Sequence, residues 1–165
     1  MSTTVQGNNS NTTQNKVHPN KAAFIEGIDH VFAKWTALLL AVENEWGGPD
    51  SIEKRDWMVD MVVDLFDKDG KNVIPEDVED RLLQIMEDEF QTQIEDSSAR
   101  DIGVIVCQMF KECIHGDHSR VDKLLKEREE REAAKAEKQI INSSKGQVES
   151  DSEDGSDDEN EVEMN

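Results

Sequence analysis

The sequence has few cysteines, no long apolar run and a shortage of basic residues. Its two cysteines, Cys107 and Cys113, lie inside an apolar helical pattern, so we expect reduced core residues of an intracellular protein rather than a disulfide framework. No apolar stretch is long enough to span a bilayer, and the N-terminus is polar, so we expect neither membrane insertion nor secretion. With 38 acidic and 18 basic residues, the net charge of -20 repels nucleic acid and anionic lipid but attracts basic proteins.

Patterns typical of catalytic or metal sites are also missing. No Ser/His/Asp or Cys/His arrangement and no Gly-rich phosphate loop stands out, so we expect neither an enzyme nor a cofactor. The segment from Asp67 resembles the start of a calcium-binding loop, but Lys71 and Val78 occupy its fifth and twelfth positions, where oxygen ligands are needed. A calcium-sensing module is therefore a minor alternative. The remaining soft donors, which lack zinc-finger spacing, are Cys107, Cys113, His115 and His118.

Apolar residues are concentrated between Phe24 and Leu125, which predicts one folded domain. Steps of three and four between these residues indicate an all-α fold, a compact bundle of about five helices. The predicted helices cover residues 20–46, 50–68, 75–90, 98–115 and a stretch from about 117. The predicted divisions are a disordered N-terminus at 1–19, a helical domain at 20–126, a charged helical extension at 127–141 and an acidic disordered tail at 142–165.

The run Glu45-Trp46-Gly47-Gly48-Pro49-Asp50 predicts a joint between the first two helices. Consecutive glycines adopt positive φ and end a helix, and proline prevents its continuation. We expect Asn20 to cap the first helix, and Asp50, with Glu53, to cap the second. Trp46 is expected to pack between the two helices, with a partner contact as the alternative.

A helical wheel places five acids of the second helix on one outward arc with Trp57 at its edge. Carboxylates beside an indole suit arginine, which pairs with the acids and stacks on the ring. The alternative is that the acids only solvate the helix while Trp57 enters the core. The arc contains Glu53, Asp56, Asp60, Asp64 and Asp67, and the third helix adds Asp77, Asp80, Glu87 and Asp88.

The acidic tail is expected to act by charge, either covering the RNA-binding patches of a basic client and competing with import receptors, or serving only solubility. From these residues alone we infer an acidic helical binder of a basic partner, and an acidic histone chaperone or nucleic-acid mimic is the alternative. The tail acids assigned to binding are Glu149, Asp151, Glu153, Asp154, Asp157, Asp158 and Glu159, followed by Glu161 and Glu163.

The run EWGGPDS, the following Asp56-Trp57-Met58, the helical pattern and the acidic tail together resemble the WGG-motif family of pre-rRNA-processing proteins. The resemblance covers roughly residues 20–126 and, by composition, the tail. It implies that Trp46, Gly47 and Gly48 form an architectural motif, and it favours partner contacts at Trp46, Asp56, Trp57, Asp60 and Asp64.

The same resemblance implies an escort chaperone for eukaryotic small-subunit ribosomal protein number twenty-six. Such an escort takes its zinc-binding client from import receptors without the usual GTPase and delivers it to the assembling small subunit, so that pre-rRNA processing depends on it indirectly. A nuclear, nucleolar and cytoplasmic location follows from the same resemblance. We expect the protein to be a monomer that binds no nucleic acid directly.

Overall fold

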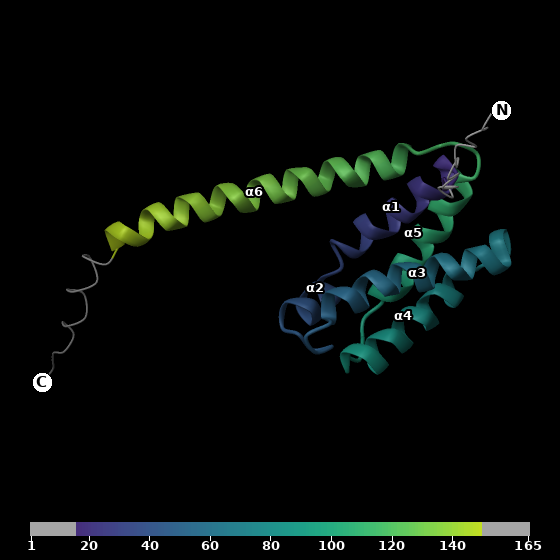
Figure 1. Ribbon diagram of the computed structural model, residues 1–165, viewed down its shortest axis with the longest axis horizontal. Helices are drawn as coiled ribbons and strands as arrows, with labels where there is room; N and C mark the ends of the chain where they lie inside the picture. The colour runs from purple at the N-terminus through teal and green to yellow at the C-terminus, as the bar shows by residue number, and fades with distance from the viewer. Residues whose placement is uncertain (1–15, 150–165) are drawn as a thin grey trace, which may run out of the picture. The chain divides into compact units, whose positions relative to one another are not determined.

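The computed structural model describes residues 16–149, with side chains described for 16–145 (Figure 1). These residues form six α-helices and one 3-10 turn, and no strand occurs among them, so the all-α prediction is confirmed. The chain divides into two units, Met1–Val121 and Asp122–Asn165. The helices are α1 (Pro19–Phe32), α2 (Thr36–Glu43), α3 (Ser51–Asp69), α4 (Pro75–Phe90), α5 (Ser98–Cys113) and α6 (Ser119–Glu149), and the 3-10 turn η1 is Gly70–Asn72.

The core of the first unit lies where α1, α3, α4 and α5 pack together. Helix α5 packs against α1 and α4, and α3 packs against α1, α2 and α4. Phe24, Phe66 and Phe110 bring α1, α3 and α5 into one aromatic cluster, with ring centroids 4.7 to 5.3 Å apart. Two of the three pairs are edge-to-face, the arrangement that aromatic quadrupoles favour.

The single first helix predicted for 20–46 is wrong, because the chain breaks after Phe32 and resumes at Thr36. Trp35 adopts an extended conformation at the break (φ -81°, ψ 105°) and is only 5% exposed. Its indole Nε1–H donates to the Ser98 hydroxyl at 3.0 Å, which pairs a buried polar group. The apolar stripe continues across the break because Trp35 and Leu38 are both buried, so periodicity could not reveal it.

Helix starts agree with the sequence in some places and not in others. Pro75 opens α4, as predicted, and Asp77 accepts from the Ile74 amide at 3.0 Å. Helix α3 ends at Asp69, one residue beyond the predicted end at 68, where Gly70 adopts φ 54°. The N-cap of α1 is His18 rather than Asn20, because the His18 ring nitrogen accepts from the Asn20 amide at 3.1 Å and Pro19 supplies the first helical position.

Helix α6 begins in the first unit and continues far into the second. Asp117 caps it by accepting from the Ser119 amide at 3.1 Å, and Arg120 donates two bonds of 2.9 and 2.8 Å to the Glu112 carboxylate. The predicted end of the charged extension at 141 lies inside this helix, which runs to Glu149. From Glu132 to Lys145 every side chain is exposed. Within residues 16–149, no helix is both long and apolar enough to cross a bilayer.

Candidate partner-binding surface

The joint that carries the WGG motif is closed by backbone hydrogen bonds around a left-handed residue. Glu45 has φ 52°, the Trp46 amide donates to the Ala41 carbonyl at 2.9 Å, and the Glu45 amide donates to the Val42 carbonyl at 3.1 Å. These two bonds form the Schellman pattern that satisfies the last carbonyls of a helix. The left-handed residue that follows α2 and terminates it is therefore Glu45, not a glycine as the sequence had predicted.

The two glycines of the motif have separate roles. A Cβ at Gly47 would lie 3.0 Å from both the Glu89 carbonyl oxygen and the Phe90 ring, so this position lets the joint approach the end of α4 closely. Gly48 has open space around it but a φ of +85°, which a side chain would strain. The two glycines thus shape the joint through close packing at Gly47 and a turn at Gly48.

Ser51 completes the joint, and sequence reasoning missed it. Its hydroxyl accepts from the Gly47 amide at 3.1 Å and donates to the Gly48 carbonyl at 2.7 Å, and the residue is 2% exposed. Asp50, predicted to cap α3, makes no side-chain capping bond. A serine at a helix start often bonds to free backbone groups, so the sequence does contain a signal for the role of Ser51. Asp50, one residue earlier, also fits the capping rule and was predicted in its place.

Trp46 is 45% exposed and lies at the C-terminal end of α4. Its ring is therefore not enclosed between the helices on either side of the joint, as its position had predicted, and it is open to a partner. The residues that line a shallow hollow together with it are Phe90, Gln91, Thr92 and Gln93.

The acidic arc of α3 faces outward, as the helical wheel predicted. Trp57 is 42% exposed, so the alternative in which it enters the core is excluded. The buried apolar face of α3 is made by Met58, Val59, Val62, Val63 and Phe66, and Met61 and Leu65 are half-buried. The exposed acids are Glu53, Asp56, Asp60 and Asp67, and Asp64 is half-exposed.

The predicted contact residues of α3 lie on two flanks. Asp56 and Asp60 border α1 and line a groove with it. Trp57 follows the opposite flank, because Met61, one turn further on, contacts Arg81 of α4 at 3.8 Å through its sulfur. Asp64 lies on the Trp57 side of the helix wheel, seven residues on. The structure therefore pairs Asp56 with Asp60 on one flank and Trp57 with Asp64 on the other, rather than forming a single cluster of the four residues.

The groove side has acids that the sequence analysis did not identify. Glu26 and Asp29 of α1 line it opposite Asp56 and Asp60, and Arg55 of α3 donates to both Asp29 and Asp56. Glu26 and Asp29 are three residues apart on an amphipathic helix, a spacing that places them on one face. The sequence prediction named acids of α3 and α4 only.

The outer face of α4 extends the acidic surface of α3. The two helices pack side by side (Figure 1), and Lys54 of α3 pairs with Glu89 of α4 at 3.1 Å. Charges of one sign on adjacent helices add to a common potential that attracts a basic partner. The exposed acids of α4 are Asp77, Asp80, Glu87 and Asp88.

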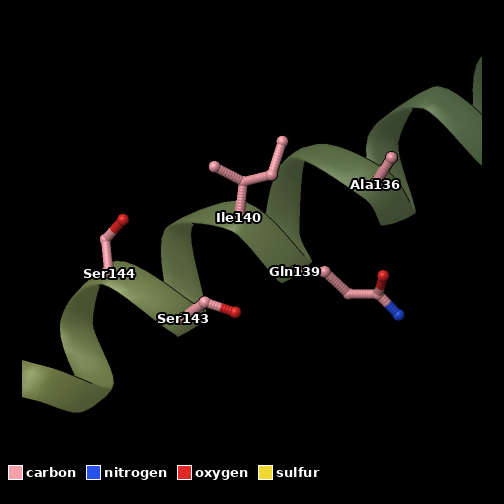
Figure 2. A pocket seen from close by; sticks show the side chains of 5 residues that line it. All are labelled: Ala136, Gln139, Ile140, Ser143 and Ser144. Carbon is pink, nitrogen blue, oxygen red and sulfur yellow. The ribbon is translucent and has the colours of Figure 1, made fainter.

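The second unit presents a different surface. Figure 2 shows a hollow on α6 lined by residues of this one helix, with Ile140 exposed between the small side chains of Ala136 and Ser144. The hollow is a gap between neighbouring turns. The tail acids from Asp151 onward lie outside the described residues, and of Glu149 the structure describes only its place at the end of α6.

The candidate metal sites considered in the sequence have other structural roles. Asp67 lies within α3 and pairs with Lys21 at 2.9 Å, and the following residues form η1. Cys107 and Cys113 are buried and free, and burial raises the pKa of both thiols, which keeps them protonated. Between residues 16 and 149, no three His, Cys, Asp or Glu side chains are grouped to hold a metal ion.

Comparison with known proteins identifies the family of this chain. The family model described as Pre-rRNA-processing protein TSR2 matches residues 24–103. Pre-rRNA-processing protein TSR2 of Saccharomyces cerevisiae is 46% identical over 115 residues, which cover 70% of this chain and 56% of that protein. Its homolog in Danio rerio is 35% identical over 96 residues, covering 58% and 52%. The chain thus spans about half the length of these curated relatives.

A solved structure gives the same result in three dimensions. The solution NMR structure of yeast TSR2 (residues 1-152) superposes with a TM-score of 0.61 at 41% identity, covering 79% of this chain and 84% of that one. The matched family segment holds the WGG joint, α3 and α4, which are the elements of the candidate surface. This chain belongs to the WGG-motif family of pre-rRNA-processing proteins.

Proposed function

We propose that the protein supports pre-rRNA processing as an escort chaperone without catalytic activity. It binds a basic small-subunit ribosomal protein, number twenty-six by the family resemblance, releases it from import receptors and delivers it to pre-ribosomes. The proposed contact residues in the folded unit are Trp46, Asp56, Trp57, Asp60 and Asp64, and the tail acids Glu149 to Glu159 cover further basic surface of the client.

The observation that carries this proposal is an exposed indole among carboxylates. Trp57 is open to solvent, and Asp64 lies seven residues further along α3 on the same flank, while Asp60, three residues on, lies toward the groove flank. An arginine that stacks on the indole face reaches a carboxylate one turn away, so one side chain gains two contacts. This pattern selects arginine-rich protein surfaces over neutral ones.

Energetics require several such contacts at once. An exposed ion pair contributes about 0 to 1 kcal/mol, so no single carboxylate of the surface accounts for stable binding. The aromatic contacts and the long-range potential supply the rest, the first through burial and the second through faster encounter. Binding is therefore expected to weaken with salt, but to retain a salt-resistant part from Trp57 and Trp46.

The proposal includes where and how the escort acts. A protein that meets its client at import receptors and passes it to pre-ribosomes works in the cytoplasm, nucleus and nucleolus. We propose a monomeric escort whose acidic surface competes with the acidic surface of the receptor for the same basic patches. The surface repels phosphate, so the client, not the escort, makes the contacts with RNA.

Binding to the purified ribosomal protein twenty-six tests this function directly. Titration at about 150 mM salt compares it with core histones, since nonspecific charge pairing is screened there. The escort function predicts clear preference for the ribosomal protein, and release of that protein from a preformed import-receptor complex. Equal affinity for histones would favour the acidic histone chaperone instead.

A paired substitution tests the surface. We expect Asp56→Ala with Trp57→Ala to lower client affinity at least tenfold while the circular dichroism spectrum is unchanged. The control is Asp80→Ala with Gln84→Ala on the outer face of α4, which removes the same charge and is expected to lower affinity about twofold, as loss of a distant charge does. Equal losses in the two variants would show that only net charge matters.

A further inference from the structure

The surface between α1 and α3 contains a groove that combines an apolar floor with an acidic rim. We call it the α1–α3 groove. Its floor is made by Ala22 and Ile25 of α1 and Val59 of α3, and Val17 lies at one end. The residues of its rim are Glu26, Asp29, Asp56 and Asp60, and Arg55 also lines it.

Ion pairs at two points hold the walls of the groove at a set spacing. Lys21 of α1 pairs with Asp67 of α3 at 2.9 Å, and Arg55 of α3 pairs with Asp29 of α1. The partners run in opposite order along the two helices, so the walls are antiparallel. The groove is thus a feature of packed helices rather than of loops, which makes it a preformed site.

The floor offers apolar surface that the fold leaves uncovered. Ala22 is exposed and Ile25 is half-buried, so both keep surface open to solvent inside the groove. Val17 is exposed at the groove's end. An aliphatic side chain placed on this floor would cover apolar area on both partners, which stabilises the complex independently of salt.

The rim already holds one guanidinium, which shows what chemistry it accepts. Arg55 is 16% exposed at its side chain, and it donates to the Asp29 carboxylate, to the Asp29 carbonyl oxygen at 3.0 Å and to Asp56 at 3.1 Å. Glu26 contacts His30 at 3.3 Å, and Asp60 makes no ion pair within residues 16–145. Four carboxylates thus face one guanidinium, and the rim keeps a negative excess.

We infer that the α1–α3 groove binds a basic segment of the ribosomal client in which an aliphatic residue lies between arginines or lysines. The aliphatic side chain covers the floor at Ala22 and Ile25, and a basic side chain pairs with Asp60 and Glu26. This inference rests on the proposed function, and it assigns to the α1 side of α3 a contact distinct from that of Trp57.

Charge and shape together choose this occupant. Phosphate and acidic peptides are repelled by the rim, and a purely apolar segment would leave its carboxylates without counter-charge. A purely basic segment would gain only exposed ion pairs and leave the floor unused. A segment with alternating aliphatic and basic character satisfies both parts of the groove.

Fluorescence anisotropy with labelled peptides and the full-length chain tests the occupant. One peptide carries two leucines among four arginines, and the second replaces both leucines by serine at equal charge. We expect the leucine peptide to bind at least tenfold more tightly, and the difference to persist in high salt because the floor contact is apolar. Equal affinities for the two peptides would overturn the inference.

Variants of the chain test whether the peptide binds in the α1–α3 groove. Ala22→Arg fills an exposed floor position and brings a cation to the rim, and Asp60→Asn removes a rim charge that has no described ion pair. The matched control Gln84→Arg adds the same charge on the outer face of α4. We expect at least a tenfold loss of leucine-peptide affinity with Ala22→Arg, about threefold with Asp60→Asn and under twofold with Gln84→Arg. Equal losses with Ala22→Arg and Gln84→Arg would overturn the groove assignment.

The client protein separates failure of this inference from failure of the proposed function. If purified ribosomal protein twenty-six does not bind the unchanged chain, the proposed function fails. If it binds the unchanged chain and Ala22→Arg equally well, the groove inference fails and the function stands. Thermal unfolding of each variant, expected to match the unchanged protein within a few degrees, checks that the groove and not the fold was altered.

Discussion

Helices α1 to α5 and the part of α6 beyond Val121 are helical for different reasons. The first five bury one face each in a shared core, and their apolar residues recur with the helical period. From Glu132 to Lys145 the long helix buries none of its side chains. Its helicity relies on residues with high helix propensity and on pairs such as Arg128 with Glu132 at 3.2 Å.

The comparison shows how the two regions suit different kinds of recognition. A packed helix holds its surface side chains in fixed positions, so Trp57 and the groove carboxylates present a defined geometry. A helix stabilised only by local terms opens at lower cost and presents charge rather than shape. Substitutions in the first region are therefore expected to change stability or selectivity, and those in the second to change neither strongly.

The largest expected effect is at Trp35. Trp35→Ala removes a buried indole and its bond to Ser98, and we expect it to lower the free energy of unfolding by about 3–5 kcal/mol in urea titration. Trp57→Ala, at an exposed position, is the matched control, with an expected cost under about 1 kcal/mol. Similar costs for the two would show that the exposed flank of α3 is part of the core.

A smaller effect is expected at the glycine joint. Gly47→Val places branched carbon against the Glu89 carbonyl and the Phe90 ring, and we expect a cost of about 1–3 kcal/mol in thermal unfolding. Gly48→Ala meets no atom but keeps a positive φ, so its cost of about 1 kcal/mol comes from backbone strain alone. A neutral Gly47→Val would mean that the joint moves freely against α4.

The pair between Glu112 and Arg120 marks the boundary between the two regions. Hydrogen bonds from Arg120 lower the pKa of the Glu112 carboxyl below its ordinary value of 4.5, so the stabilisation is present above that pH and is lost as pH falls through the lowered pKa. Glu112→Gln is expected to cost about 1 kcal/mol near pH 7, since both side chains are partly exposed. Chemical denaturation at pH 7 and pH 3 measures the difference, which should shrink at pH 3. If this difference in unfolding free energy were the same at both pH values, the carboxylate charge would not be its cause.

The smallest effect is expected in the long helix. Ile140→Ser with Ile141→Ser changes two exposed side chains, and we expect the free energy of unfolding to change by less than about 0.5 kcal/mol. The contrasting variant is Ile28→Ser in α1, which buries an unpaired hydroxyl and is expected to cost several-fold more. A large loss from the α6 variant would reveal a covered apolar face.

The sequence predicted the helices well where one periodic stripe meets one buried face. The stop at Gly70, the start at Pro75 and the outward acids of α3 all follow from local rules. The break at Trp35 does not follow from a local rule, because the buried side chains on both sides of the bend keep the helical period in the sequence. At the break, Trp35 bonds to Ser98, a partner distant in the chain that no local rule identifies.

The candidate surface was predicted in part for the same reason. Helical wheels located the exposed face of α3, but they treat each helix alone. Which acids share a groove depends on the neighbour across the interface, so Glu26 and Asp29 became visible only once α1 and α3 were packed. Asp56 and Trp57 are adjacent in the sequence but lie on different flanks of α3, and only Asp56 shares the groove with α1.

Ser51 turns the glycine joint into a self-contained connector. Its hydroxyl bridges the amide and the carbonyl of the two glycines, so the corner from α2 to α3 carries its own internal bracing. A segment with this property is suited to transplantation, and a designed pair of helices joined by residues Glu45 to Ser51 should inherit the bend without the rest of the bundle. The WGG motif and Ser51 thus form one structural unit.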